Sequence, residues 1–259
     1  MFGAADKAAP ASPGADPLHM FVCGCPRSGT TALGRLLNQH PAIALGLERY
    51  KFVFGRRLDE FRPDLFALPR FLDIRAEDSN NPNTHLAEKF APGLEMRVVG
   101  DKIPYLDRRF PHVQQAFPEA RMLAIFRDPA DVARSWQQRA DNPADSWRAE
   151  AGAAAALVEW KSAVDRVRSN LGRWGGRMTI LSYEPFFRVA DAQALAANFA
   201  RLLAVLDLRM ADADLLHAAA AIFTPPRPTA PSALPPGIAA EAAALRHDPA
   251  YRALLARAL

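Results

Sequence analysis

Apolar residues along the chain fall into short continuous runs that are separated by longer stretches with helical spacing. The short runs predict buried strands, and they lie at residues 18–23, 96–99, 122–126 and 178–181. Stretches with helical spacing lie at residues 32–40, 147–171, 192–206 and 212–221 and near the C-terminus. Strands that alternate with helices favour an α/β fold of three layers, in which helices flank a mainly parallel central sheet.

The local composition divides the chain into regions. Residues 1–17 are rich in Ala, Pro and Gly and predict a flexible leader. Residues 18–259 are expected to form a single domain, and 48–94 an insertion or lid that is partly helical. Within this insertion, residues 55–71 interleave arginines with phenylalanines. They could form a lid that accommodates an acidic sugar, an acidic peptide or a phenol, but the pattern favours an amphipathic helix with a solvated polar side. Another helix is expected to start at Asp128, which can cap it.

Composition and charge exclude several classes of protein. Of the 259 residues, 50% are hydrophobic and 23% are charged, which excludes fibrous and disordered chains. The net charge of +4 comes without a long basic run, so it does not indicate a nucleic-acid partner. There is no run of apolar residues long enough to span a membrane. The two cysteines, Cys23 and Cys25, are too close for an unstrained disulfide, which favours reduced thiols and a cytoplasmic location.

The most informative segment lies between the first strand and its helix and reads Gly24-Cys25-Pro26-Arg27-Ser28-Gly29-Thr30-Thr31. A glycine-bearing turn at a helix start directs backbone N–H groups at one point and favours a phosphate or sulfate there. The spacing of Gly24 and Gly29 is that of the nucleotide-triphosphate loop G-x-x-x-x-G-K-[ST]. However, Thr30 stands where that loop has lysine, which favours a donor with one 5′-phosphate over ATP.

These residues resemble the sulfotransferase family. CPRSGTT, followed by a leucine-rich helix and the pair His40-Pro41, looks like the 5′-phosphosulfate loop of these enzymes. They use 3′-phosphoadenosine 5′-phosphosulfate (PAPS) as sulfuryl donor. A second signature of the family binds the 3′-phosphate: an Arg at a strand end, then Asp-Pro, then a Ser eight residues after the Arg. Here it is matched from Arg127 to Ser135.

The resemblance implies a P-loop-like sulfotransferase architecture and a role for each matching residue. Donor-binding residues would be Arg27, Ser28, Gly29, Thr30, Thr31, Arg127 and Ser135. Glu48 lies eight residues after His40, near the position of the catalytic base in glutamate-type enzymes such as tyrosylprotein and some carbohydrate sulfotransferases. Lys102, in a Lys-x-Pro segment, would stabilise the leaving oxygen, and Arg27 would assist catalysis.

Several alternatives stay open at this stage. Glu48 and Lys102 could instead form surface ion pairs, and His85 or His112 could be the base. The chain could be a P-loop kinase or NTPase, or a non-catalytic relative that binds a nucleotide or a protein.

The acceptor stays unidentified, and it could be a small molecule, a carbohydrate or a peptide. No metal, nucleic-acid partner or membrane span is expected, and the oligomeric state cannot be read. Tyr183 and Glu184 are interpreted as structural, and the four tryptophans as core or interface residues. In the family, a basic, Gly-rich loop near the C-terminus often closes the 3′-phosphate site. This chain has only Arg227 in the corresponding stretch, so Arg227 is not assigned to the site.

Overall fold

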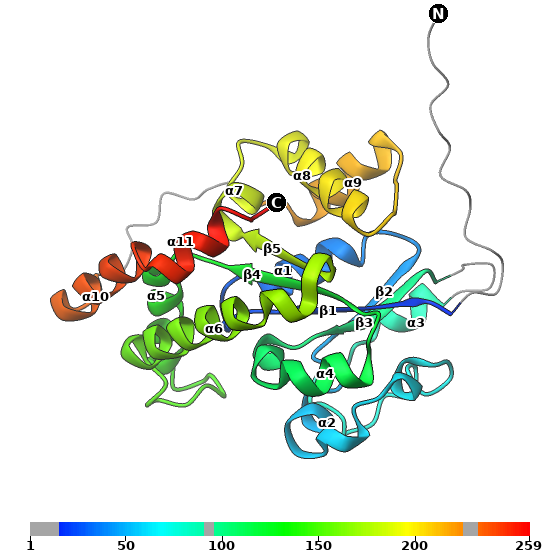
Figure 1. Cartoon of the computed structure of the whole chain (residues 1–259), viewed down its shortest axis with the longest axis horizontal. Helices are drawn as coiled ribbons and strands as arrows, with labels where there is room; N and C mark the ends of the chain where they lie inside the picture. The colour runs from blue at the N-terminus through cyan, green and yellow to red at the C-terminus, as the bar shows by residue number, and fades with distance from the viewer. Residues whose placement is uncertain (1–15, 91–95, 225–232) are drawn as a thin grey trace, which may run out of the picture.

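A five-stranded parallel sheet forms the centre of the computed structural model, which describes residues 16–90, 96–224 and 233–259 (Figure 1). The strands are β1 (Leu18–Cys23), β2 (Ile43–Leu47), β3 (Val98–Lys102), β4 (Arg121–Phe126) and β5 (Met178–Ser182). Their order is β2-β3-β1-β4-β5, so β1 is central and pairs in parallel with β3 and β4. The predicted α/β fold with a parallel central sheet is therefore confirmed.

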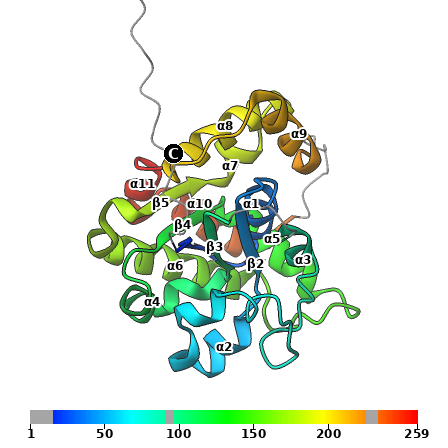
Figure 2. The same ribbon diagram turned by 90° about the vertical axis from the view of Figure 1, so that its right-hand side faces the viewer.

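Helices cover both faces of this sheet, which explains why its strands are nearly continuous apolar runs. Met20 and Val22 of β1 point to one face, and Phe21 and Cys23 point to the other. The first face packs against α1 (Thr30–Leu37), α7 (Tyr183–Phe187), α8 (Ala192–Val205) and α9 (Asp212–Ile222). The second packs against α4 (Phe110–Ala116), α5 (Pro129–Ala140), α6 (Ala153–Trp174), α10 (Pro236–Arg246) and α11 (Pro249–Leu255). Figure 2 shows α8 and α9 above the strands and α4 below them.

One strand was missed, and the bounds of another strand and of one helix were wrong. Strand β2 was missed, because Ile43–Leu47 is short and lies just before the expected insertion. Strand β3 was placed at residues 96–99 but continues to Lys102, since its polar residues Asp101 and Lys102 are buried at the strand end. The helix expected from residue 147 begins only at Ala153, because residues 147–152 form turns.

The insertion after β2 contains short helices, as expected, rather than one long amphipathic helix. These are α2 (Lys51–Arg56), η1 (Leu58–Glu60), η2 (Pro63–Phe66) and α3 (His85–Lys89). The amphipathic helix predicted over residues 55–71 is absent from the described chain. Instead, Phe61, Phe66 and Phe71 point into a cluster of aromatic rings with Phe21 of β1 and Phe117, which anchors the insertion to the sheet.

The cap predicted for α5 is present. The Asp128 carboxylate accepts hydrogen bonds from the N–H groups of Ala130 and Asp131, and Pro129 occupies the first turn. Arg246 of α10 binds the same carboxylate and joins the C-terminal helices to this corner. Residues 1–15 of the leader predicted over 1–17, and Arg227, lie outside the described residues. In the ranges that are described, no helix is both long and apolar enough to cross a bilayer.

Candidate active site

The carboxyl ends of all five strands meet at one edge of the sheet, where α/β proteins bind their ligands. The residues that follow β2, β4 and β5 are Glu48, Arg127 and Tyr183. Lys102 is the last residue of β3, and the loop from Gly24 to Thr31 follows β1. The topology therefore brings segments that are up to 159 residues apart to one place.

The loop after β1 is shaped to bind an anion. Helix α1 begins at Thr30, and Gly29 before it has φ 96°, a left-handed conformation that glycine adopts without strain. A Cβ at Gly29 would lie 2.4 Å from the ring of Tyr183, so glycine is also needed for space. The Ser28 hydroxyl is buried and has no hydrogen-bond partner among the described residues. An anion in the loop would supply that partner.

Arg27 connects this loop to helix α5. Its Nε donates a hydrogen bond of 2.9 Å to the Ser135 hydroxyl, across 108 residues of sequence. Trp136 fixes the loop from the same helix, because its Nε1 donates to the Pro26 carbonyl at 2.9 Å. Burial lowers the pKa of Arg27, and the charges of Arg139 and Arg127 lower it further. Burial and neighbouring positive charge at Arg27 favour the binding of an anion beside it.

Arg127 lies against the residues of two neighbouring segments. Its guanidinium carbon lies 4.6 Å from the ring centre of Tyr183, and Nη2 lies 3.6 Å from a carboxylate oxygen of Asp131. Its Nε is buried without a partner among the described residues. Tyr183 therefore contacts both the loop glycine and Arg127, which the interpretation of this residue as structural did not foresee. Tyr183 directly follows the apolar run of β5, and this position in the sequence indicates that it lies at the carboxyl edge of the sheet.

Glu48 and Lys102 lie in direct contact. Lys102 Nζ donates a 2.7 Å hydrogen bond to Glu48 Oε1, and Lys51 Nζ lies 3.5 Å from Oε2. The Lys102 side chain is only 2% exposed, whereas that of Glu48 is 25% exposed. Burial acts to raise the pKa of Glu48, but the charges and hydrogen bonds of Lys102 and Lys51 outweigh it and hold this pKa below its ordinary value. Glu48 is thus a carboxylate at neutral pH and reaches solvent.

The backbone at Glu48 is strained, with φ 59° in the left-handed region that few residues other than glycine adopt. Such a conformation costs on the order of 1–3 kcal/mol and persists only where the surroundings impose it. Here the Glu48 N–H donates to the Lys102 carbonyl at 2.8 Å. The next two N–H groups, of Arg49 and Tyr50, donate to the buried Asp101 carboxylate at 3.0 and 2.8 Å. Asp101 thereby fixes the turn that carries Glu48.

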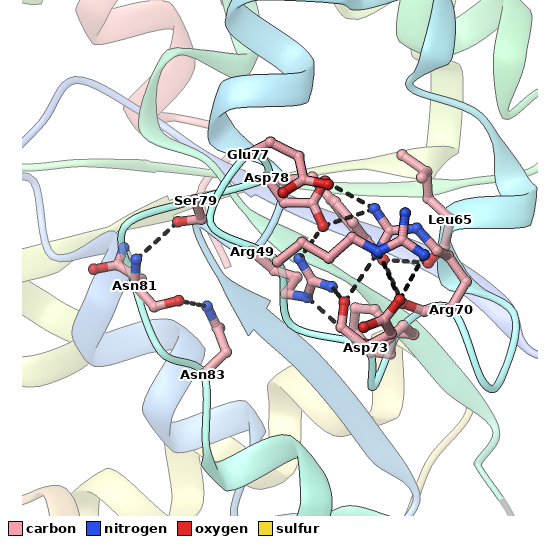
Figure 3. A network of polar contacts seen from close by, with 12 residues as sticks. Arg49, Leu65, Arg70, Asp73, Glu77, Asp78, Ser79, Asn81 and Asn83 are labelled. Carbon is pink, nitrogen blue, oxygen red and sulfur yellow. Dashed lines mark hydrogen bonds and ion pairs between the residues drawn. The ribbon is translucent and has the colours of Figure 1, made fainter.

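A buried ion cluster secures the same turn from the insertion (Figure 3). The Arg49 side chain is fully buried and its Nη1 lies 2.8 Å from Asp78. It also donates to the carbonyl oxygens of Phe71 and Asp73. Arg70 binds the same Asp78 carboxylate, at 2.6 Å. Neither Asp101 nor this cluster was predicted, because Arg49 lies 22 to 52 residues away from its partners along the chain.

A cavity of about 830 Å³ opens beside Glu48. It extends from the anion loop, at Arg27, Thr30 and Thr31, toward helix α2 and the segment η3 (Pro104–Arg109) after β3. Trp147 lines it and also packs against the hydrophobic core, where the tryptophans were expected. Trp136, Trp160 and Trp174 are buried.

The structure brings all of the predicted site residues to this edge of the sheet, but neither alternative histidine. His85 is hydrogen-bonded to the Leu45 carbonyl and lines a different pocket, and His112 lies on α4 outside the cavity. Within the described ranges, no three His, Cys, Asp or Glu side chains gather as metal ligands would.

Comparison with known proteins agrees with this geometry. The model of a sulfotransferase family matches residues 19–212, which is about three quarters of the chain. The chain belongs to the sulfotransferase family. The matched range includes the loop after β1 and the residues Glu48, Lys102, Arg127 and Ser135.

Solved sulfotransferase structures share the fold. A sulfotransferase from Alicyclobacillus acidocaldarius is similar with a TM-score of 0.58 and 19% identity over 95% of this chain and 98% of that one. The sulfotransferase domain of the curacin biosynthetic pathway has a TM-score of 0.53 and 17% identity, over 89% and 98% of the two chains. The sulfotransferase domain of the Synechococcus PCC 7002 olefin synthase has a TM-score of 0.52 and 19% identity, over 96% of this chain and 99% of that one. A search of curated proteins found no match.

Proposed function

We propose that this sulfotransferase transfers the sulfuryl group of PAPS to a hydroxyl or amine acceptor and releases 3′-phosphoadenosine 5′-phosphate (PAP). The observation that carries the proposal is the contact between Glu48 and Lys102 at the mouth of the anion loop. A carboxylate and a buried lysine at this point supply the two groups that sulfuryl transfer requires besides the donor site. The replacement of the NTPase lysine by Thr30 supports a sulfuryl donor over ATP.

The donor site has two halves, which the hydrogen bond between Arg27 and Ser135 joins. The 5′-phosphosulfate would lie in the loop after β1, held by Arg27, Ser28, Gly29, Thr30 and Thr31. The N-terminus of α1 adds partial positive charge there. Arg127 and Ser135 would bind the 3′-phosphate, since the buried Nε of Arg127 has no partner among the residues that the structure describes and Ser135 has a hydroxyl that can donate.

The chemistry then follows from Glu48 and Lys102. Glu48 removes the proton from the acceptor oxygen or nitrogen, and the atom thus activated forms the new bond to sulfur. The bond from sulfur to the bridging phosphate oxygen breaks, and its electron pair stays on that oxygen. Lys102 neutralises this developing charge, while Arg27 stabilises the charge on the equatorial oxygens. Lys102 must leave Glu48 to do so, which frees the carboxylate as base.

Calorimetry without added metal tests the donor class. We expect PAP to bind with micromolar affinity, ATP and AMP to bind more weakly, and Arg127→Ala or Arg27→Ala to weaken PAP binding at least tenfold. Arg121→Ala is the matched control, because Arg121 lies at the opposite end of the strand that precedes Arg127. A preference for Mg·ATP would indicate a kinase, and well-folded protein that binds no nucleotide would contradict the proposal.

A further inference from the structure

Positive charge dominates the cavity beside Glu48. Six of its described lining residues are cationic, and the only carboxylate among them is Glu48. The cations are Arg27, Lys51, Arg56, Arg108, Arg109 and Arg139. Like charges gathered in a partly enclosed cleft raise its potential and favour an anion.

The donor accounts for only one of these six cations, Arg27, which is assigned to the 5′-phosphosulfate. The cavity includes the sulfuryl end of the donor loop, at Thr30 and Thr31, but neither Arg127 nor Ser135 lines it. It extends instead to α2 and η3, which belong to the insertion and to the segment after β3. The side of the cavity beyond Glu48 is therefore the place for the acceptor.

Three of these six cations already have a carboxylate partner. Lys51 lies 3.5 Å from Glu48, Arg108 pairs with Glu159, and Arg139 makes two hydrogen bonds to Asp145. Arg56 and Arg109 are exposed and have no carboxylate within 4 Å in the described part of the chain. They come from the ends of α2 and η3, two different elements that line the same cavity.

Aromatic rings lie against several arginines of this cavity, including Arg56. The guanidinium carbon of Arg56 lies 4.5 Å from the ring centre of Phe52, and that of Arg108 lies 4.0 Å from Tyr105. A stacked guanidinium keeps its N–H fork free for a carboxylate, and it loses less conformational freedom when it binds one. Phe52 and Tyr105 also line the cavity and offer an apolar surface to the body of a ligand.

We propose that the acceptor of this enzyme carries an anionic group in addition to the nucleophile, and that Arg56 and Arg109 bind that group. The proposal rests on the proposed function, because it treats the cavity as the acceptor side of a sulfotransferase. The ligand class is a hydroxyl compound with a carboxylate or similar oxyanion and an apolar or flat body. An acidic aromatic compound and an acidic sugar share this chemistry.

Matched probes test the charge requirement. Binding to the PAP-loaded and the free protein is followed by ligand-detected NMR for 4-hydroxyphenylacetate, its neutral amide and the cationic tyramine. A second arm compares methyl glucuronide with methyl glucoside, which distinguishes an aromatic from a sugar acceptor. We expect the anionic member of at least one arm to bind at least tenfold more tightly than its neutral or cationic analogue, and more weakly as salt increases.

Variants assign the effect to the two arginines. Arg56→Gln with Arg109→Gln is expected to abolish the preference for the anion and to leave PAP binding unchanged. Arg62→Gln is the control, because Arg62 is an exposed arginine of the same insertion that does not line the cavity. If PAP binds but no anionic probe is preferred, or the double variant keeps the preference, the acceptor proposal is wrong. If PAP itself does not bind, the proposed function fails.

Discussion

Glu48 combines a strained backbone with an ion pair to a buried lysine. The left-handed conformation at φ 59° directs its side chain to Lys102 and to the cavity at once. A residue chosen for stability alone would be glycine or asparagine at this φ. The strain therefore supports a role for Glu48 in the reaction rather than in folding.

Replacement of Glu48 by glutamine tests this role directly. We expect Glu48→Gln to lower kcat by about 10²–10⁴-fold, the usual contribution of a general base, while PAP binding stays within a factor of three. Turnover is measured by sulfuryl transfer to any acceptor that the wild type accepts. Lys51→Gln is the control, since Lys51 also contacts Glu48 but has no role in the proposed chemistry. Full activity of Glu48→Gln would exclude it as the base.

The pH dependence of kcat/KM identifies the base independently. Because Lys102 and Lys51 hold the pKa of Glu48 below its ordinary value, activity should stay constant down to about pH 5 and fall only below it. A histidine base would place the acidic limb near pH 6.5, the ordinary pKa of that side chain. Circular dichroism at each pH separates loss of the base from unfolding, and a limb near pH 6.5 in folded protein would refute the assignment.

At the scale of elements, one buried side chain joins two strand ends. The Asp101 carboxylate in β3 accepts hydrogen bonds from the N–H groups of Arg49 and Tyr50, which follow β2. Gly46 of β2 makes room for this contact, because a Cβ there would lie 2.8 Å from the Asp101 carboxylate. The turn that presents Glu48 thus depends on β3 as much as on its own strand.

Loss of this carboxylate should destabilise the fold and the turn together. Asp101→Ala leaves two buried N–H groups without acceptors, at about 1–3 kcal/mol each, so we expect a loss of about 2–6 kcal/mol in unfolding free energy from urea denaturation. Ser182→Ala, a polar side chain buried at the end of β5, is the comparison and should cost less. An Asp101→Ala variant as stable as the wild type would contradict the role given to these contacts.

The sequence predicted elements best where signals are local. The loop after β1, the capped start of α5 and the apolar strands β1, β4 and β5 are read from contiguous residues. The end of β3 was misplaced because burial of Asp101 and Lys102 depends on partners in β2 and the insertion, which periodicity does not reveal. The phenylalanines of the insertion likewise pack on β1 and Phe117 rather than on one helix face.

At the scale of the whole molecule, Asp101 makes stability depend on pH. Burial raises the pKa of Asp101 to about 7, despite its backbone hydrogen bonds and the charge of Lys102. In the unfolded chain an aspartate releases its proton near pH 4. Between these values the folded protein binds more protons than the unfolded one, so this residue's contribution to stability falls as pH rises from about 4 to 7.

Urea denaturation at pH 5 and pH 8 measures this contribution. Other groups titrate in the same interval, and the lowered pKa values of His19 and His40 act in the opposite direction. The comparison with Asp101→Asn removes them, because they are common to both proteins. We expect the substitution to destabilise the protein more at pH 5 than at pH 8. An equal effect at both values would mean that Asp101 is ionised throughout.

The place of the insertion in the sheet has a consequence for the evolution of specificity. The chain leaves the sheet after the edge strand β2 and returns in its neighbour β3, whereas the anion loop and Arg127 belong to β1 and β4. A new loop grafted between β2 and β3 could exchange Arg56 and its surroundings without altering the donor half. Such a graft must keep Glu48, Arg49 and Asp101, which fix the turn after β2, and it must supply the buried Arg49 with a carboxylate in place of Asp78. The part of the acceptor preference that depends on the insertion can therefore diverge, or be engineered, separately from the donor half.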